Sequence, residues 1–349
     1  MTRVLFAALL LVVGCAEAAR ARPPVAYKIV TASERGTYFA IGQDLAKFVA
    51  PEAGIDLQVL PTVGSAANVR LLRYEPGVKM AVVQADVIQA FIDRAGKGQT
   101  AASALVAPLR VILPLYDTEI HFVVRADSPL NYLHEIKNAK INGGLIGSGA
   151  ALITSTVYSM MFNTPIPEQN ATFLSNEEAL VKLISDKSID VVTIAAGQPA
   201  PIIANMRPEA RGFIKFLKFD EKNPLSQPIL QTYFAATLHA SSYPHILQQD
   251  LQTVAVGAYL VTYDFQTRDT AARMGQFATA LCRNFETLQT QGHPKWREVS
   301  LSFPELGPGW TYYGPTTRAI KACVASRPAP ASGRAQSCSQ QEQILGLCK

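Results

Sequence analysis

The chain has 349 residues, of which 48% are hydrophobic and 17% are charged, and its formal net charge at pH 7 is +5. This length suits two domains, since one domain usually takes about 100–200 residues. The basic residues are scattered, with no basic run and no basic helix face rich in aromatic side chains. The patterns typical of nucleic-acid-binding proteins are therefore excluded.

The amino terminus has the pattern of a secretory signal peptide. Arg3 is followed by an unbroken apolar run over residues 4–13. That run is too short to span a bilayer, which takes about 20 residues, and a basic start, a short apolar core and small residues after it are typical of a signal peptide. We therefore expect residues 1–18 to form a leader and the protein to work in the periplasm or the cell envelope.

The leader offers two cleavage sites, and the sequence leaves both open. Residues 12–15 resemble a bacterial lipobox, in which Cys15 would be lipidated and become the first mature residue. Residues 16–18 form an A-x-A site, which would release a protein without a lipid anchor.

Cysteine usage agrees with export. Four cysteines follow Cys15, and an oxidising compartment allows them to pair. Three pairings are conceivable, and we expect Cys282–Cys323 and Cys338–Cys348. The chain contains no C-x-x-C segment, so we expect neither a zinc ribbon nor a thioredoxin-type site.

The first part of the chain repeats one unit, a short apolar strand, a loop of small residues and an amphipathic helix. We predict strands over residues 27–31, 56–60 and 79–83, with the third followed by a helix over residues 85–94. This alternation is typical of a parallel sheet with helices on both faces, the α/β class.

The middle of the chain breaks and then restarts the unit. We predict strands over residues 109–115 and 120–125, and a further strand over residues 140–145. A helix over residues 150–162 follows, and a second helix begins at Asn176, its predicted cap, and ends at Ser185. The last strand and loop of this part are predicted over residues 189–195 and 197–199.

The carboxyl-terminal part of the chain is predicted to belong to the same lobe as the first part. A β-branched stretch over residues 253–261 predicts a strand, and an apolar stripe predicts one long helix over residues 268–291. The two runs predict two lobes: lobe I over residues 26–120 plus 235–325, and lobe II over residues 121–234. Residues 326–349 are rich in Pro, Ala, Ser and Gly and are predicted to be a flexible tail.

Motifs of catalysis are missing from the sequence. It contains no G-x-S-x-G, H-E-x-x-H or phosphate-loop pattern, and its five histidines are far apart. We therefore expect neither an enzyme nor a metal or cofactor site. A periplasmic hydrolase stays an alternative, because a fold can assemble a catalytic triad from distant residues.

The loops that follow the predicted strands carry a family resemblance. Residues 31–42 resemble the first loop and helix of the TAXI family, the solute-binding subunits of tripartite ATP-independent periplasmic (TRAP) transporters. Further segments are similar to motifs of that family in the same order, and the resemblance covers residues 26–325; these segments are residues 62–72, 81–86, 147–149 and 196–199.

The resemblance implies a type II periplasmic binding protein fold, in which two lobes joined by crossing strands close on a solute. The solute would be anionic or zwitterionic, such as glutamate or a related carboxylate, and the protein would deliver it to TRAP membrane subunits. We expect a monomer without a cofactor. A sensor or scaffold of the envelope that uses the same fold is the alternative.

Ligands of open α/β sheets bind beyond the carboxyl ends of the strands, so the loops of both lobes should line one cleft. Glycine and serine at the start of a helix present backbone amides and the positive dipole end to an anion. After Gly149 the family's Thr-Arg or Thr-Glu pair is replaced by Ala150 and Ala151, which puts glutamate as the ligand in doubt. The predicted ligand-binding residues are Thr37, Tyr38, Gly64, Ser65, Gln84, Tyr116, Ser148, Gly149, Ala150 and Gln198.

Overall fold

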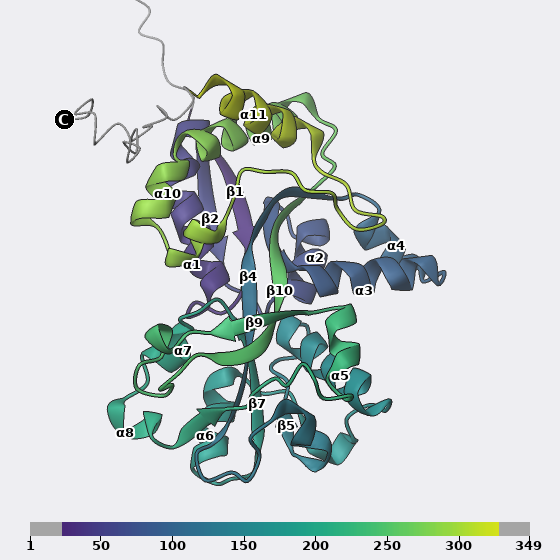
Figure 1. The fold of residues 1–349 in the computed structure, drawn as a ribbon. Helices are drawn as coiled ribbons and strands as arrows, with labels where there is room; N and C mark the ends of the chain where they lie inside the picture. The colour runs from purple at the N-terminus through teal and green to yellow at the C-terminus, as the bar shows by residue number, and fades with distance from the viewer. Residues whose placement is uncertain (1–22, 328–349) are drawn as a thin grey trace, which may run out of the picture.

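The computed structural model describes residues 23–327 (Figure 1), so the predicted leader, Cys15, residues 328–349 of the predicted tail and the predicted Cys338–Cys348 pair lie outside the described residues. Ser326, where the tail was predicted to begin, is instead the last residue of a helix. Within residues 23–327, no helix combines the length and the apolar character that a membrane span requires. The strands are β1 Val25–Val30, β2 Ile55–Leu60, β3 Val78–Gln84, β4 Leu109–Arg125, β5 Ile141–Asn142, β6 Ala171–Thr172, β7 Val191–Ala196, β8 Ile214–Phe216, β9 Phe234–Leu238 and β10 Leu251–Tyr263. The α-helices are α1 Thr37–Asp44, α2 Ser65–Tyr74, α3 Ala85–Gly96, α4 Thr100–Val106, α5 Gly149–Phe162, α6 Asn176–Ile184, α7 Pro201–Ala204, α8 Pro208–Arg211, α9 Arg268–Arg283, α10 Phe285–Gln291 and α11 Gly314–Ser326.

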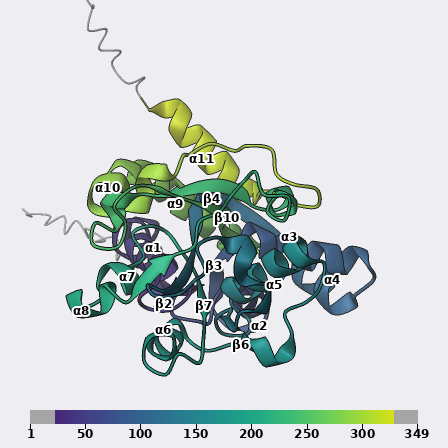
Figure 2. The ribbon, with the colours of Figure 1, turned by 60° about the horizontal axis from the view of Figure 1, so that its bottom comes forward.

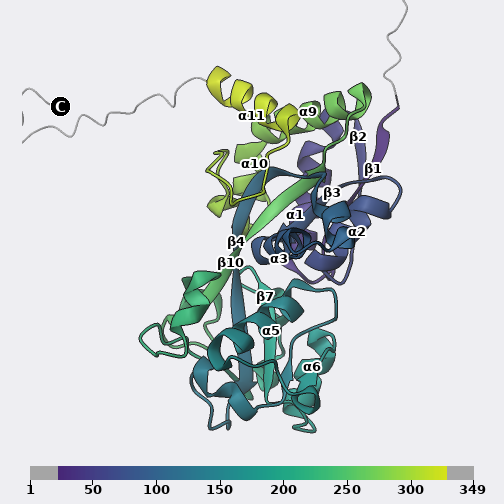
Figure 3. The ribbon, with the colours of Figure 1, turned by 90° about the vertical axis from the view of Figure 1, so that its right-hand side faces the viewer.

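Two long strands, β4 and β10, run through both lobes (Figures 1 and 3). The sheet order is β2-β1-β3-β10-β4-β7-β5-β6, with β8 paired to β4 and β9 paired to β10. On the lobe I side β1 pairs in parallel with β2 and β3, and on the lobe II side β5 pairs in parallel with β6 and β7. The helices that cover these two halves form lobe I (α1–α4, α9–α11) and lobe II (α5–α8).

The prediction of two strands over residues 109–115 and 120–125 is wrong, because β4 continues through the polar segment between them. Asp117, Thr118 and Glu119 pair with Gly257, Val256 and Ala255 of β10. Only the register shifts there, between Gly257 and Tyr259. Polar side chains interrupt the apolar pattern without interrupting the backbone ladder.

The end of one strand and the start of one helix in lobe II also differ from the sequence predictions. The predicted strand over residues 140–145 is reduced to β5, because the glycines at 143 and 144 take the chain out of the sheet. The helix predicted to begin with Asn176 as its cap is capped by Ser175, whose hydroxyl accepts from the Glu178 amide while the Glu178 carboxylate accepts from the Ser175 amide.

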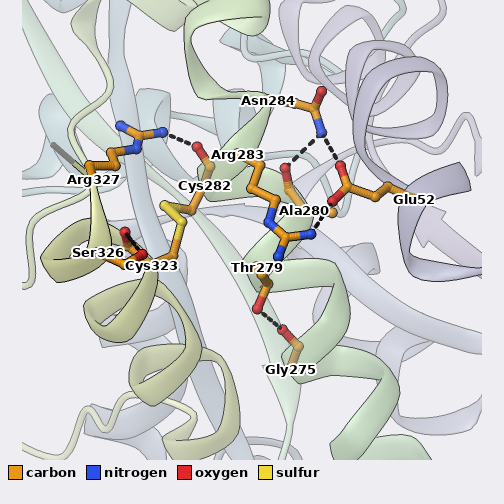
Figure 4. The surroundings of a disulfide bond; sticks show 10 residues. All are labelled: Glu52, Gly275, Thr279, Ala280, Cys282, Arg283, Asn284, Cys323, Ser326 and Arg327. Atoms are coloured by element: carbon orange, nitrogen blue, oxygen red, sulfur yellow. Dashed lines mark hydrogen bonds and ion pairs between the residues drawn. A yellow bond between two sulfur atoms is a disulfide. The ribbon is translucent and has the colours of Figure 1, made fainter.

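The single helix predicted over residues 268–291 divides into α9 and α10 at Asn284. The amide group of the Asn284 side chain donates to Glu52 Oε2 at 2.7 Å and to the Ala280 carbonyl at 3.0 Å (Figure 4). The Arg283 guanidinium donates to the other oxygen of Glu52 at 2.8 Å. The contacts of Arg283 and Asn284 with Glu52 hold the junction between α9 and α10 in place.

Each lobe has its own apolar core. In lobe I, Ile29, Leu45 and Met80 pack with Phe277 and Trp296. In lobe II, the clusters around β7 include Leu238 of β9 and Leu251 of β10. The lobe boundaries given from the sequence stay a prediction.

A disulfide joins Cys282 of α9 to Cys323 of α11 (Figure 4), as the sequence analysis expected. The two cysteines are 41 residues apart, and closing a loop of that length in the unfolded chain corresponds to about 3–4 kcal/mol in the chain-entropy model. We expect the Cys282→Ser/Cys323→Ser protein to lose about that much free energy of unfolding, measured in urea. Reduction of the wild-type protein should give the same loss, and a loss below about 1 kcal/mol would contradict the prediction.

Candidate functional site

A cavity of about 200 Å³ lies where the loops of the two lobes meet. Its walls come from the ends of β1, β2 and β3 on one side and from the loops around α5, α6 and β7 on the other. Most of the residues predicted to bind ligand line it, namely Thr37, Tyr38, Gly64, Ser65, Gln84, Ser148, Gly149 and Ala150. Tyr116 and Gln198 do not line it.

Four helices of at least eight residues begin at this cavity, and the single-turn helix α7 begins there with Pro201. The four longer helices are α1, α2, α5 and α6, whose first residues are Thr37, Ser65, Gly149 and Asn176, and all four residues line the cavity. The first backbone amides of a helix lack partners within the helix, and its dipole is positive at that end. The converging ends therefore favour an anionic group in the cavity.

The two lobes differ in how these helix ends are capped. In lobe I, Gly36 and Gly64 precede α1 and α2, and neither helix has a side-chain cap. In lobe II, the hydroxyl groups of Ser148 and Ser175 accept from Ala151 and Glu178. The helix ends of lobe I are therefore the ones suited to a ligand's negative charge.

Tyr38 contributes a buried hydroxyl to the cavity wall. Its side chain is 7% exposed, and its hydroxyl has no hydrogen-bond partner among the described residues. Burial raises the pKa of Tyr38, so the hydroxyl stays protonated and can donate. Buried hydroxyl groups without a partner are uncommon, and this one belongs to a residue of the cavity wall and lies near Ser65, which also lines the cavity.

Ser65 and Gln84 form the floor between these helices. The Ser65 hydroxyl accepts from the backbone amide of Gln84 at 3.2 Å, and it lies 3.4 Å from the side-chain oxygen Oε1 of Gln84. Gln84 is 2% exposed. Its carboxamide lies against Gly149 of the other lobe, where a Cβ atom would stand 1.4 Å from Gln84 Oε1.

Direct contacts between the lobes surround the cavity. The Ala67 amide donates to the Gly147 carbonyl at 3.0 Å, and the Thr37 hydroxyl to the Gly197 carbonyl at 3.4 Å. Gly64 has φ +128°, and a Cβ atom there would be 3.2 Å from Ser148 Cα. The helices α3 and α5, from different lobes, also lie side by side (Figure 2). The lobes are thus closed on each other.

A buried carboxyl group makes a further contact between the lobes. The Tyr233 hydroxyl, in the lobe II core, donates to Asp86 Oδ2 at 3.0 Å. Asp86 lies in the first turn of α3 in lobe I. Burial raises the pKa of Asp86 to about 6, so this carboxyl is costly to ionise, and its hydrogen bonds come from the Tyr233 hydroxyl and the Val87 backbone amide.

Behind the cavity a buried charge cluster joins the crossing strand β4 to both lobes. Lys295 Nζ lies 2.6 Å from Glu119 Oε1 and 2.7 Å from Glu298 Oε1. The side chains of Lys295 and Glu119 are 1% and 7% exposed. Sequence reasoning did not single out Glu119, Lys295 or Glu298. The one available clue was Glu119 itself, a charged residue between two apolar runs.

Gln198 belongs to this cluster. Its backbone and side-chain amides donate to the two Glu119 oxygens at 3.0 Å, and its side-chain oxygen Oε1 accepts from the His239 backbone amide at 2.8 Å. Tyr116 lies under Lys295, whose Nζ is 5.8 Å from the ring centroid. Both residues therefore support the crossing region, where the structure gives them no contact with the cavity.

Metal-ligand residues and histidines are placed as follows in the part of the chain that the structure describes. Within residues 23–327, no group of three or more His, Cys, Asp or Glu side chains is placed to hold a metal ion. None of the described residues lining the cavity is a histidine. His121 is buried elsewhere, with Nε2 2.6 Å from the Tyr243 hydroxyl.

Two α/β lobes, crossing strands and a cavity between the lobes define the periplasmic binding protein fold, so the α/β, two-lobed fold class predicted from the sequence is confirmed. The chain belongs to the NMT1-like family, whose model matches residues 29–301.

Solved structures with distant similarity include XAC2383 from Xanthomonas citri bound to ATP, with 11% identity, coverage of 86% of this chain and 96% of that one, and a TM-score of 0.48. The periplasmic binding protein BugD has 12% identity, coverage of 86% and 94%, and a TM-score of 0.48. The arginine-, lysine-, histidine-binding protein ArtJ from Geobacillus stearothermophilus has 12% identity, coverage of 80% and 97%, and a TM-score of 0.46. The ligands named are those of the other proteins.

Proposed function

We propose that this protein is an exported, extracytoplasmic solute-binding protein that captures a small carboxylate-bearing solute and delivers it to a TRAP-type membrane permease. The observation that carries the proposal is the cavity between the closed lobes, where four helices of at least eight residues begin and a buried hydroxyl has no partner among the described residues. The loop segments that resemble the TAXI family supply Thr37, Tyr38, Ser65 and Gln84 to the same cavity.

Closure converts binding into a change of shape. A solute in the cavity touches groups of both lobes only when the lobes are closed, so it stabilises the closed form over an open one. The hydrogen bonds of Ala67 with Gly147 and of Thr37 with Gly197 also stabilise the closed form. The permease would recognise the surface that closure creates.

The first test is thermal unfolding of the mature protein with a panel of small carboxylic acids. A ligand at 100 times its dissociation constant should stabilise the folded form by about 2.7 kcal/mol. A panel in which no acid raises the melting temperature would contradict capture of a carboxylate. Binding without delivery would be shown by a deletion strain that takes up the bound acid at the wild-type rate.

Tyr38→Phe tests the role of the cavity hydroxyl. A hydrogen bond to a charged group contributes about 1.5–3 kcal/mol, so we expect the dissociation constant of the acid to rise about 10–150-fold. Stability without ligand should barely change, because the hydroxyl has no partner among the described residues. Tyr74→Phe, at a tyrosine 66% exposed on α2, is the matched control and should bind as the wild type does.

A further inference from the structure

We propose that the cavity selects an acid with one negative charge and an uncharged apolar body, and that it discriminates against α-amino acids and dicarboxylates. This inference rests on the proposed function and names the class of solute for the same site. The charges and the polarity of the two cavity walls carry it.

The wall from lobe I offers hydrogen-bond donors. The uncapped starts of α1 and α2 and the unpartnered Tyr38 hydroxyl lie on this side. Tyr38 is more than nine-tenths buried, so its hydroxyl adds to the helix ends a second, independent feature that calls for a ligand acceptor. One carboxylate fits this wall.

The wall from lobe II is largely apolar. Ala150, Ile194, Ala195, Pro201 and Ile202 line it beside the polar Ser148, Ser175, Asn176 and Glu177. Of the helices that begin there, α5 and α6 already have serine caps. A second carboxylate on this wall would lose its hydration without gaining comparable donors, which is unfavourable. An aliphatic or aromatic body would instead bury apolar surface against these side chains.

Among the described residues that line it, the cavity also offers an α-ammonium group no fully buried carboxylate. Arg35 and Glu177 are the charged residues among the described residues that line it. They face each other from the two lobes at 3.9 Å, and their side chains are 72% and 43% exposed. Glu177 is thus opposed by a guanidinium at the rim, and Gln84 Oε1 is already next to the Ser65 hydroxyl. A buried ammonium group without a charged partner is unfavourable.

The volume of the cavity limits the length of the apolar part of the solute. A volume of about 200 Å³ corresponds to roughly seven water molecules at about 30 Å³ each. A short branched chain fits this space, and 4-methylpentanoate is a suitable probe. Leucine is the same acid with an α-ammonium group, and glutarate is an acid of similar length with a second carboxylate.

The experiment is calorimetric titration of the mature protein with 4-methylpentanoate, leucine, glutarate and glutamate. We expect 4-methylpentanoate to bind at least about 100-fold more tightly than the other three, since leucine and glutarate each bury one additional unpaired charge and glutamate buries two. If leucine, glutarate or glutamate binds as tightly, the inference is overturned while the proposed function stands. If none of the four acids binds, the inference and the capture of small carboxylates both fail.

A charge placed on the lobe II wall should change this preference. Ala150 lies in the first turn of α5, where an acidic residue is compatible with the helix dipole. In Ala150→Asp the ratio of leucine to 4-methylpentanoate dissociation constants should shrink at least about 10-fold, because the new carboxylate repels the acid and accepts from the ammonium group. Ala150→Asn has the same shape without the charge and should keep the wild-type ratio. Equal ratios in the two variants would overturn the inference.

Discussion

Lys295→Met should lower the free energy of unfolding by about 3–5 kcal/mol, the usual cost of removing one partner of a buried ion pair. Methionine fills the volume of the lysine stem, so the loss would reflect the charge and not a cavity. The substitution leaves the Glu119 carboxylate 7% exposed with only the two Gln198 amides as donors. Urea unfolding at neutral pH measures the effect.

Two further variants separate the charge effect from other causes. Lys28→Met removes a surface ion pair with Glu75, 3.1 Å long and with side chains 30% and 40% exposed, and should cost less than about 1 kcal/mol. Lys295→Met combined with Glu119→Gln removes both charges and should recover part of the loss, because no unpaired charge stays buried and one of the two Gln198 donors keeps an acceptor oxygen. No recovery in the double variant would show that the cluster does not act through its charges.

The fold was predictable because the chain repeats one local pattern. Each apolar strand followed by small residues and a helix stands for one βα unit, and the carboxyl ends of such strands come together in any open sheet. That rule places Thr37, Ser65 and Ser148 at one cavity although the last is more than 80 residues from the second. Position at a strand end was therefore sufficient to place eight of the ten predicted ligand-binding residues at the cavity, while Arg35 and residues 175–177 of its wall were missed.

The crossing region was not predictable in the same way. Lys295 pairs with Glu119 across 176 residues of sequence, and Tyr233 with Asp86 across 147. No local pattern marks such pairs, because their partners meet only after both lobes have formed. Gln198 follows a strand end and was expected at the cavity, but the Glu119 carboxylate lies closer and takes its amide groups.

The helix division at Asn284 and the continuous strand β4 have the same origin. Apolar periodicity continues through Asn284, and it is the distant Glu52 that binds the side chain and fixes the break. In β4 the polar segment Asp117–Glu119 lacks the apolar pattern of a strand, and it is the distant β10 that keeps the backbone extended. In both places tertiary contacts override local sequence preference.

Gly149→Ala should weaken solute binding about 5–150-fold, because overpacking a close contact costs about 1–3 kcal/mol. The new Cβ atom would lie 1.4 Å from Gln84 Oε1 and 2.5 Å from Gln84 Cδ, so the whole carboxamide has to move into the cavity. Gly149 has no left-handed backbone conformation and lies in a helix, where alanine is favourable. The substitution therefore destabilises the closed arrangement of the lobes and not the folded lobes themselves. The melting temperature without ligand should change little. Calorimetric titration with the bound acid measures the loss.

A second substitution distinguishes a steric block from loss of a ligand contact. In the Gln84→Ala background the clash is absent, so adding Gly149→Ala should cost much less than it does in the wild type, a coupling that a double-mutant cycle reports directly. Gly212→Ala, at a glycine with no atom within 4 Å of the added Cβ, is the matched control and should leave affinity unchanged. If Gly149→Ala weakens binding equally in both backgrounds, the close approach of the lobes at Gln84 does not limit closure, and Gly149 acts through its own contact with the solute.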